Sequence, residues 1–140
     1  MKSEYSPASL PSARIIAADA AGIAEAAAII RGGGIVAFPT ETVYGLAADA
    51  TSEAAVARIY AAKARPTFNP LIAHVASLDA ALEQGLFSAE AQHLAKAFWP
   101  GPLTLVVPLA PDATVCPAAR AGLQSIALRV PVHPVALGLI

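Results

Sequence analysis

Four stretches of the chain repeat apolar residues every three or four positions, which is the period of a helix with one packed face. Each of the two longest begins beside a side chain that can accept a hydrogen bond from the first helical turn: Asp19 for one, Thr51 or Ser52 for the other. The predicted helices cover residues 20–31, 53–63, 79–86 and 89–98, and another opens after Pro134. Lys63 continues the apolar stripe of the second helix, so we expect it on the packed side of the helix end.

Short apolar runs bounded by glycine, proline or polar residues lie between these helices, a pattern typical of buried strands. They cover residues 35–38, 71–75, 103–109 and 125–130. Alternation along the last run places Ser125, Ala127 and Arg129 on one face. An arginine inside an apolar strand needs a partner, and no acidic residue lies near it in the sequence, so the pattern suggests a bound carboxylate. Strands alternating with helices predict an α/β fold with some antiparallel pairing.

The composition limits the partners that the chain can bind. Only 14% of the residues are charged, and nine Lys and Arg oppose ten Asp and Glu, so no global positive field draws in nucleic acid. The single cysteine, Cys116, excludes an internal disulfide and a cysteine-cluster metal site. The chain has neither an apolar run long enough for a membrane span nor a secretory signal pattern, so we expect a soluble, cytoplasmic protein without membrane contact.

The sequence predicts a short lead-in followed by one domain. Residues 1–13 are rich in serine and proline and are predicted to be a flexible N-terminal lead-in, and residues 14–140 form one domain. That domain is expected to be incomplete at the C-terminus, because the helix that opens after Pro134 breaks off at Ile140 without a capping residue.

One cation-rich segment is a candidate anion site. Residues 63–74 hold Lys63, Arg65, Asn69 and His74 in an otherwise apolar background. Arginine offers a planar fork and lysine a movable point charge for phosphate oxygens. The plainer interpretation is a pair of cations at a helix C-terminus and a core imidazole bonded to backbone.

A second candidate segment follows the strand at 35–38. Thr40, Thr42 and Tyr44 lie at the carboxyl end of that strand, where open α/β sheets build ligand sites. The plainer interpretation is an ordinary loop with a capping threonine. No spacing of His, Asp or Glu in the chain indicates a protein metal site.

Four segments in register resemble the threonylcarbamoyl-AMP synthase family, whose catalytic unit is the YrdC-like domain. They are residues 38–46 (Phe-Pro-Thr-Glu-Thr-Val-Tyr-Gly-Leu), 63–74, 99–104 (Trp-Pro-Gly-Pro-Leu-Thr) and 127–134 (Ala-Leu-Arg-Val-Pro-Val-His-Pro). The resemblance implies a YrdC-like open twisted mixed sheet flanked by helices and truncated at the C-terminus. It also implies a nucleotidyltransferase that makes threonylcarbamoyl-AMP and pyrophosphate from L-threonine, bicarbonate and ATP. A separate tRNA threonylcarbamoyl-transferase complex then modifies the adenosine at position 37 of tRNA.

The resemblance also implies roles for individual residues. Threonine would be bound by Thr42, His74 and Arg129, with Arg129 on the carboxylate. ATP would be bound by Lys63, Arg65, Asn69 and Ser125, and Lys63 and Arg65 would act in catalysis by positioning phosphate and stabilising its charge. Thr40 and Tyr44 would shape the pocket between the two substrates. Mg²⁺ would arrive with ATP, held mainly by phosphate oxygens rather than by the protein.

This chain departs from the family pattern in two ways. Ala64 stands where the family usually has glycine, which is tolerable if its φ is negative. The family's domain also continues with Ser-Ala-Asn and Ser-Thr-Val segments that are absent here, so the isolated chain is expected to have weak or no activity and an open sheet edge prone to association.

Two other interpretations remain open from the sequence. One is a non-catalytic YrdC-like protein that binds double-stranded RNA through a local patch at Arg58, Lys63 and Arg65. The other is an inactive truncated fragment that folds in part.

Overall fold

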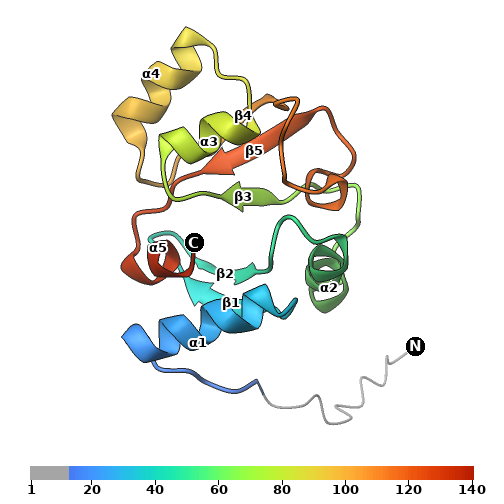
Figure 1. Ribbon diagram of the computed structural model, residues 1–140, viewed down its shortest axis with the longest axis vertical. Coiled ribbons are helices and arrows are strands. Elements are labelled where there is room, and N and C mark those ends of the chain that lie inside the picture. Colours follow the sequence, from blue (N-terminus) through green and yellow to red (C-terminus); the bar gives the residue numbers. More distant parts are fainter. Residues whose placement is uncertain (1–12) are drawn as a thin grey trace, which may run out of the picture.

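The structure is a computed structural model that describes residues 13–140; the predicted lead-in therefore lies outside the described residues, except for Ala13. The elements in chain order are α1 (Ala20–Arg31), β1 (Val36–Pro39), β2 (Tyr44–Ala47), α2 (Glu53–Lys63), β3 (Ile72–His74), α3 (Leu78–Gln84), α4 (Ala89–Phe98), β4 (Leu105–Pro108), the 3₁₀ helix η1 (Pro117–Arg120), β5 (Ser125–Arg129) and α5 (Pro134–Leu139). The predicted mixed α/β fold is confirmed (Figure 1). Within the described part of the chain, no helix is both long and apolar enough to cross a bilayer.

The helices begin where their capping side chains lie. The Asp19 carboxylate accepts a hydrogen bond from the Gly22 amide at 2.8 Å, and the hydroxyls of Ser52 and Ser88 accept from amides of the first turn in α2 and α4. The helix predicted at 79–86 starts one residue earlier, because the hydroxyl of Ser77 caps it. These boundaries depend on neighbours in the sequence, which is why the pattern predicts them well.

The strands form two open sheets (Figure 1). In one, β1 pairs with β2 antiparallel; in the other, β5 lies between β3, to which it is parallel, and β4, to which it is antiparallel. Strand β2 was not predicted: the chain after Pro39 was taken for a loop, but it turns at residues 40–43 and returns along β1. Gly45 permits this return, since a Cβ there would lie only 3.0 Å from the ring of Phe38.

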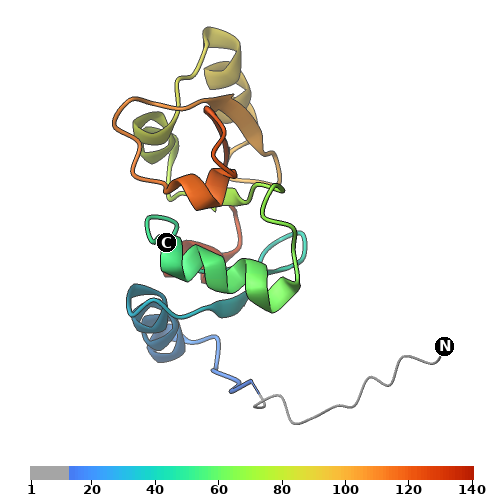
Figure 2. The ribbon, with the colours of Figure 1, turned by 90° about the vertical axis from the view of Figure 1, so that its right-hand side faces the viewer.

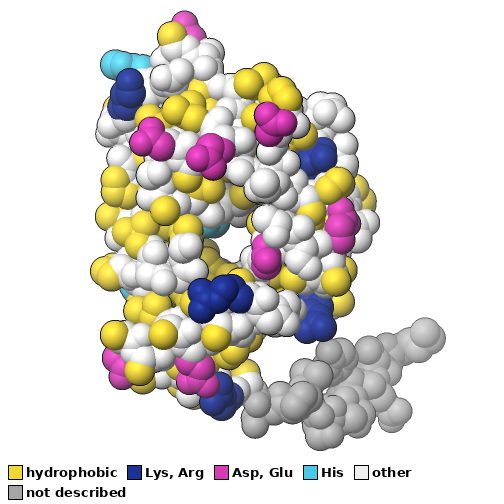
Figure 3. Space-filling view, viewed as in Figure 1, with side chains coloured by type: hydrophobic (Ala, Val, Ile, Leu, Met, Phe, Trp, Pro, Cys, Tyr) yellow, Lys and Arg dark blue, Asp and Glu magenta, His cyan; other side chains and the backbone are white. Residues whose placement is uncertain are grey.

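The two faces of β5 have different surroundings. Ile126 and Leu128 are 2% and 0% exposed and belong to the main core with Val107 of β4, under α3 and α4. The opposite face, which carries Ala127 and Arg129, looks toward the β1–β2 hairpin (Figure 1). Figure 3, drawn in the same view, shows the molecule hollowed at the level between β2 and β3. The predicted alternation therefore separates a face that packs into the main core from a face whose Arg129 reaches the hairpin turn.

Helix α2 ends in a left-handed residue, which corrects an expectation from the sequence. Ala64 has φ +47° and ψ 37°, so the negative φ under which alanine was expected to be tolerable here is not adopted. Its amide still donates to the carbonyls of Tyr60 and Ala61, so the residue closes the helix in the position that glycine usually takes. An alanine Cβ in this region clashes with the following carbonyl oxygen, and Ala64 is therefore strained.

Replacing Ala64 with glycine is expected to raise the free energy of unfolding by about 0.5–1 kcal/mol. Relief of the left-handed strain outweighs the extra backbone entropy that glycine gains in the unfolded chain. Urea denaturation measures the change. Ala57→Gly, at an exposed position inside α2, is the matched control and should lose about 1 kcal/mol. If both variants lost stability equally, the left-handed strain at Ala64 would not be real.

Candidate functional site

Arg129 lies at the meeting point of three segments that are distant in the sequence. It is 7% exposed. Its Nε donates to the carbonyl of Gly101 at 3.1 Å, its Nη1 to the hydroxyl of Thr42 at 3.3 Å, and its Nη2 forms an ion pair with Glu41. The expectation that no acidic partner exists was wrong, because the hairpin turn brings Glu41 to β5. Burial lowers the pKa of the Arg129 guanidinium from its ordinary value, yet arginine stays charged at neutral pH.

Arg129 and its partners Gly101, Thr42 and Glu41 are called the Arg129 cluster below. Glu41 connects this cluster to the chain that follows β5. Its Oε1 faces Arg129, while its Oε2 accepts hydrogen bonds from the amides of Val132 at 2.9 Å and His133 at 3.3 Å. Sequence reasoning assigned no role to Glu41. The available signal was one carboxylate in a segment otherwise made of apolar residues, threonines and a tyrosine.

The turn at residues 40–43 is ordered by its own threonines. The Thr40 hydroxyl accepts from the amides of Thr42 and Val43 and donates to the carbonyl of Val43 at 2.5 Å. The Thr42 hydroxyl lies 3.0 Å from that of Thr40 and accepts from Arg129. Thr40 therefore acts as the capping threonine of the plainer interpretation, whereas Thr42 points to Arg129. Tyr44, predicted to shape the pocket, is 77% exposed.

His74 lies beside Arg129 in the parallel ladder. The register of β3 and β5 pairs the two residues, so their side chains lie on the same face of the sheet. The imidazole Nδ1 lies 3.1 Å from the carbonyl of Ile72, and the ring meets that of Phe38 edge-on with 6.1 Å between centroids. Burial lowers the pKa of His74, and the hydrogen bond with Ile72 partly opposes this shift. The three residues implied for threonine, Thr42, His74 and Arg129, are thus brought together.

The stability of the chain is expected to fall between neutral pH and mildly acidic pH because of His74. The pKa of His74 is lower in the folded chain than in the unfolded chain, where it is about 6.5. The neutral imidazole therefore stabilises the fold above pH 6.5, and this contribution is lost as the pH falls from there through the folded pKa. Urea denaturation at several pH values between 7.5 and 5 measures the loss. His74→Gln should flatten this part of the profile, and His93→Gln, at an exposed position of α4, is the matched control.

The residues implied for ATP are less closely assembled. Lys63 is exposed, which corrects the expectation that it lies on the packed side of α2. The Arg65 guanidinium donates to the carbonyls of Asn69 at 3.2 Å and Pro70 at 3.0 Å, so it orders its own loop. Ser125 is half-buried on the face of β5 that carries Arg129. No hydrogen bond or ion pair within residues 13–140 joins Lys63 or Arg65 to the Arg129 cluster.

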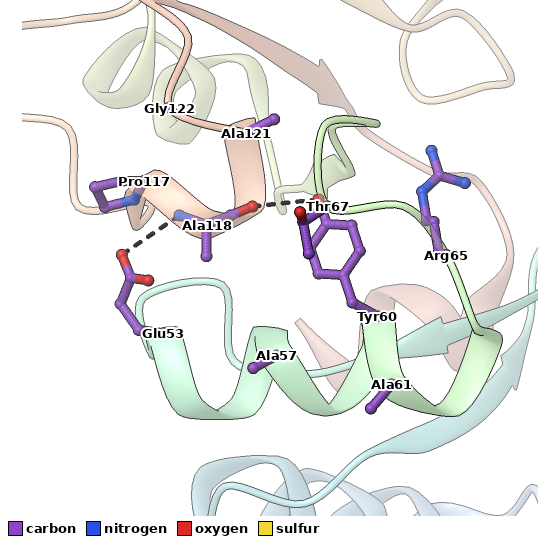
Figure 4. Close-up of a pocket in the computed structure, with 10 residues that line it drawn as sticks. All are labelled: Glu53, Ala57, Tyr60, Ala61, Arg65, Thr67, Pro117, Ala118, Ala121 and Gly122. Carbon is purple, nitrogen blue, oxygen red and sulfur yellow. Dashed lines mark hydrogen bonds between the residues drawn. The ribbon is translucent and has the colours of Figure 1, made fainter.

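A separate groove of about 610 Å³ lies between α2 and η1, which run side by side on one flank of the molecule (Figure 2). The phenol of Tyr60 crosses it to donate to the carbonyls of Asn69 and Ala118, and Glu53 accepts from the amide of Ala118 (Figure 4). Arg65 borders the groove, but its guanidinium points away from Ala57 and Glu53 (Figure 4). Because most of the lining is alanine, proline and glycine, this groove suits a triphosphate poorly.

The comparisons with known proteins show which family the chain resembles. The Sua5/YciO/YrdC family model, described as "Telomere recombination", matches residues 28–140. A threonylcarbamoyl-AMP synthase of Bacillus subtilis is 52% identical over 120 residues, which are 84% of this chain and 34% of that protein. The enzyme of the same name from Pyrococcus abyssi is also 52% identical, over 82% of this chain and 34% of its own length.

Solved structures give the same picture. P. abyssi Sua5 complexed with L-threonine superposes with a TM-score of 0.82 at 49% identity, over 91% of this chain and 36% of that chain. Escherichia coli YciO, at 24% identity and a TM-score of 0.74, shares the fold; the match covers 86% of this chain and 58% of that one. The chain spans about a third of the length of the first curated relatives that it matches.

Proposed function

Because the chain belongs to the Sua5/YciO/YrdC family, we propose that the protein is an L-threonylcarbamoyladenylate synthase. Such an enzyme is a nucleotidyltransferase that forms threonylcarbamoyl-AMP and pyrophosphate from L-threonine, bicarbonate and ATP. The observation that carries the proposal is the gathering of Thr42, His74 and Arg129 where the turn of the β1–β2 hairpin meets β3 and β5. A relative at 49% identity is described as complexed with L-threonine, which supports the same substrate here.

At the threonine end, Arg129 would hold the substrate carboxylate. Nε, Nη1 and Nη2 each have a partner and Nη2 is fully buried, so the second N–H of Nη1 is the donor left for a ligand. The charge of the guanidinium and the low exposure of the site would strengthen its hydrogen bond to a carboxylate bound there. Burial keeps His74 neutral near pH 7, and its Nδ1 donates to the carbonyl of Ile72, so its Nε2 can accept one hydrogen bond from the substrate. This pair would orient the threonine rather than react with it.

At the nucleotide end, Lys63, Arg65, Asn69 and Ser125 would hold ATP. The amine of threonine and bicarbonate give a carbamate and water; a carbamate oxygen then attacks the α-phosphorus, and pyrophosphate leaves. Negative charge grows on phosphate oxygens in this step, and cations stabilise it without a protein nucleophile. Lys63 is exposed on a flexible stem and can move to the phosphates, whereas Arg65 is already held by its loop.

Mg²⁺ is proposed only as the ion that ATP carries. Within residues 13–140, no three side chains of His, Cys, Asp or Glu come together. The donors of this part of the chain therefore do not form a cage for the ion, whose usual ligands in nucleotide sites are phosphate oxygens and water. No step above is assigned to the metal.

The test is incubation of the full-length protein with L-threonine, bicarbonate and ATP. The expected result is pyrophosphate release that depends on both threonine and bicarbonate, with threonylcarbamoyl-AMP identified by mass spectrometry. Omission of threonine or of bicarbonate is the control. Absence of pyrophosphate release, or release that does not respond to threonine, would contradict the proposal.

We also propose the biological setting that this activity requires. The product is a reactive mixed anhydride, so a transferase complex must take it up and deliver the threonylcarbamoyl group to the adenosine at position 37 of tRNA. The proposal includes a cytoplasmic location, in which the protein would meet that complex and its tRNA. Direct contact with tRNA would depend on local cations such as Arg58 and Lys63, because the formal net charge is only −1.

A further inference from the structure

We propose that Glu41 is a positioning residue of the threonine site. Its carboxylate holds Arg129 and the turn that carries Thr42 in the arrangement that presents both to the substrate carboxylate. The inference rests on the proposed function and adds a residue that neither the sequence motifs nor the resemblance assigned to binding.

Both carboxylate oxygens of Glu41 are occupied by donors from different segments. Oε1 forms the ion pair with Nη2 of Arg129, and Oε2 accepts from the amides of Val132 and His133. Only 19% of its side chain is exposed. Glu41 therefore ties the hairpin turn to β5 and to the start of α5, and neither connection is made by a backbone ladder.

The hydrogen bonds of Arg129 show why its orientation depends on Glu41. The guanidinium has five N–H groups, and Gly101, Thr42 and Glu41 each accept from one of its three nitrogens. This fixes the plane of the fork, and because Nη2 is fully buried, the second N–H of Nη1 is the donor left for a ligand. Without Glu41, Nη2 loses its charged partner, and the turn that carries Thr42 loses its anchor to Val132. The remaining donor of Nη1 is then no longer held in one direction in which to meet a carboxylate.

An argument from charge alone predicts the opposite effect of losing Glu41 on threonine binding, so an experiment can distinguish the two roles. Removing the Glu41 carboxylate leaves Arg129 uncompensated, and an uncompensated cation attracts an anionic substrate more strongly. If Glu41 acts mainly by cancelling charge, its loss should tighten threonine binding. If Glu41 acts by positioning, its loss should weaken threonine binding, because a displacement of about 1 Å can cost about a hundredfold.

Glu41→Gln tests this in the full-length enzyme. Glutamine has one acceptor oxygen and an NH₂ group, so it cannot accept from Arg129 and from the two amides at the same time. We expect the KM for threonine to rise by about 10- to 100-fold, while the KM for ATP changes by less than about twofold. Glu41→Asp keeps the charge but is one methylene shorter, and it should also raise the KM for threonine, since it reaches only one of the two partners.

Glu53→Gln is the matched control. Glu53 also accepts a hydrogen bond from a backbone amide, that of Ala118 at 3.3 Å, but it lies in the groove between α2 and η1. Its KM values should match those of the wild type. An unchanged or lowered KM for threonine in Glu41→Gln would overturn the proposal. If that variant were also less stable, Glu41 would contribute to the stability of the fold but not to threonine binding.

A second measurement separates this inference from the proposed function. In ¹⁵N-labelled protein without substrate, the Nε–H resonance of Arg129 reports how well the guanidinium is held against Gly101. We expect its hydrogen exchange to be at least tenfold faster in Glu41→Gln than in the wild type or Glu53→Gln. Equal exchange would overturn the positioning role whether or not the enzyme makes threonylcarbamoyl-AMP. A wild type that shows slow exchange but no threonine-dependent reaction would refute the proposed function alone.

Discussion

Replacing Arg129 with methionine is expected to abolish threonine binding and to lower the free energy of unfolding by about 3 kcal/mol. Methionine fills a similar volume but removes the partner of Glu41, and a carboxylate left unpaired in a largely buried site is costly. The carbonyl of Gly101 also loses its charged donor. Isothermal titration with L-threonine and urea denaturation measure the two effects.

Two further variants isolate the causes of these losses. Arg129→Lys keeps the charge but not the planar fork, so it should recover part of the stability while threonine binding stays at least tenfold weaker. The double variant Glu41→Met with Arg129→Met removes both charges, and it should be more stable than the sum of the single losses predicts. Additive losses of stability would show that the two side chains do not interact. Wild-type threonine affinity in Arg129→Met would show that the guanidinium does not bind threonine.

Replacing Leu128 with alanine is expected to lower the free energy of unfolding by about 3–4 kcal/mol while leaving the site face intact. Leu128 is 0% exposed and lies in the main core with Val107 and Ile126. Losing a buried leucine side chain removes its transfer free energy and leaves a cavity that the neighbours fill only in part. Urea denaturation gives the loss, and titration of the variant that remains folded should give threonine affinity within about twofold of the wild type.

Ile126→Val is the graded control for this substitution. It removes one methylene from the same face of β5 and should lose about 1 kcal/mol. A loss below about 1 kcal/mol in Leu128→Ala would contradict the assignment of this face to the core. Together with Arg129→Met, these variants test whether one face of β5 contributes mainly to stability while the other contributes to threonine binding.

The helices and the faces of β5 could be predicted because their causes are local. Asp19, Ser52 and Ser88 bond to amides three residues onward, and periodicity follows the helical turn or the pleat. Strand β2 was missed because only its pairing with β1 makes it a strand. The exposure of Lys63 and the positive φ of Ala64 were missed for a related reason: the path of the chain toward β3 decides how the end of α2 turns.

The amino-acid sequence alone was enough for the α-helices, for every strand except β2, for the family resemblance, and for Thr42, His74 and Arg129 as site residues. It did not determine that Glu41, rather than a bound carboxylate, is the partner of Arg129, or that Gly101 accepts from it. Thr42 and Arg129 are 87 positions apart, and their contact exists only because the hairpin turn is placed against β5. Helix period and capping act within one turn, whereas pairing between distant charges depends on strand register and on how two sheets face each other. Only the tertiary structure sets these.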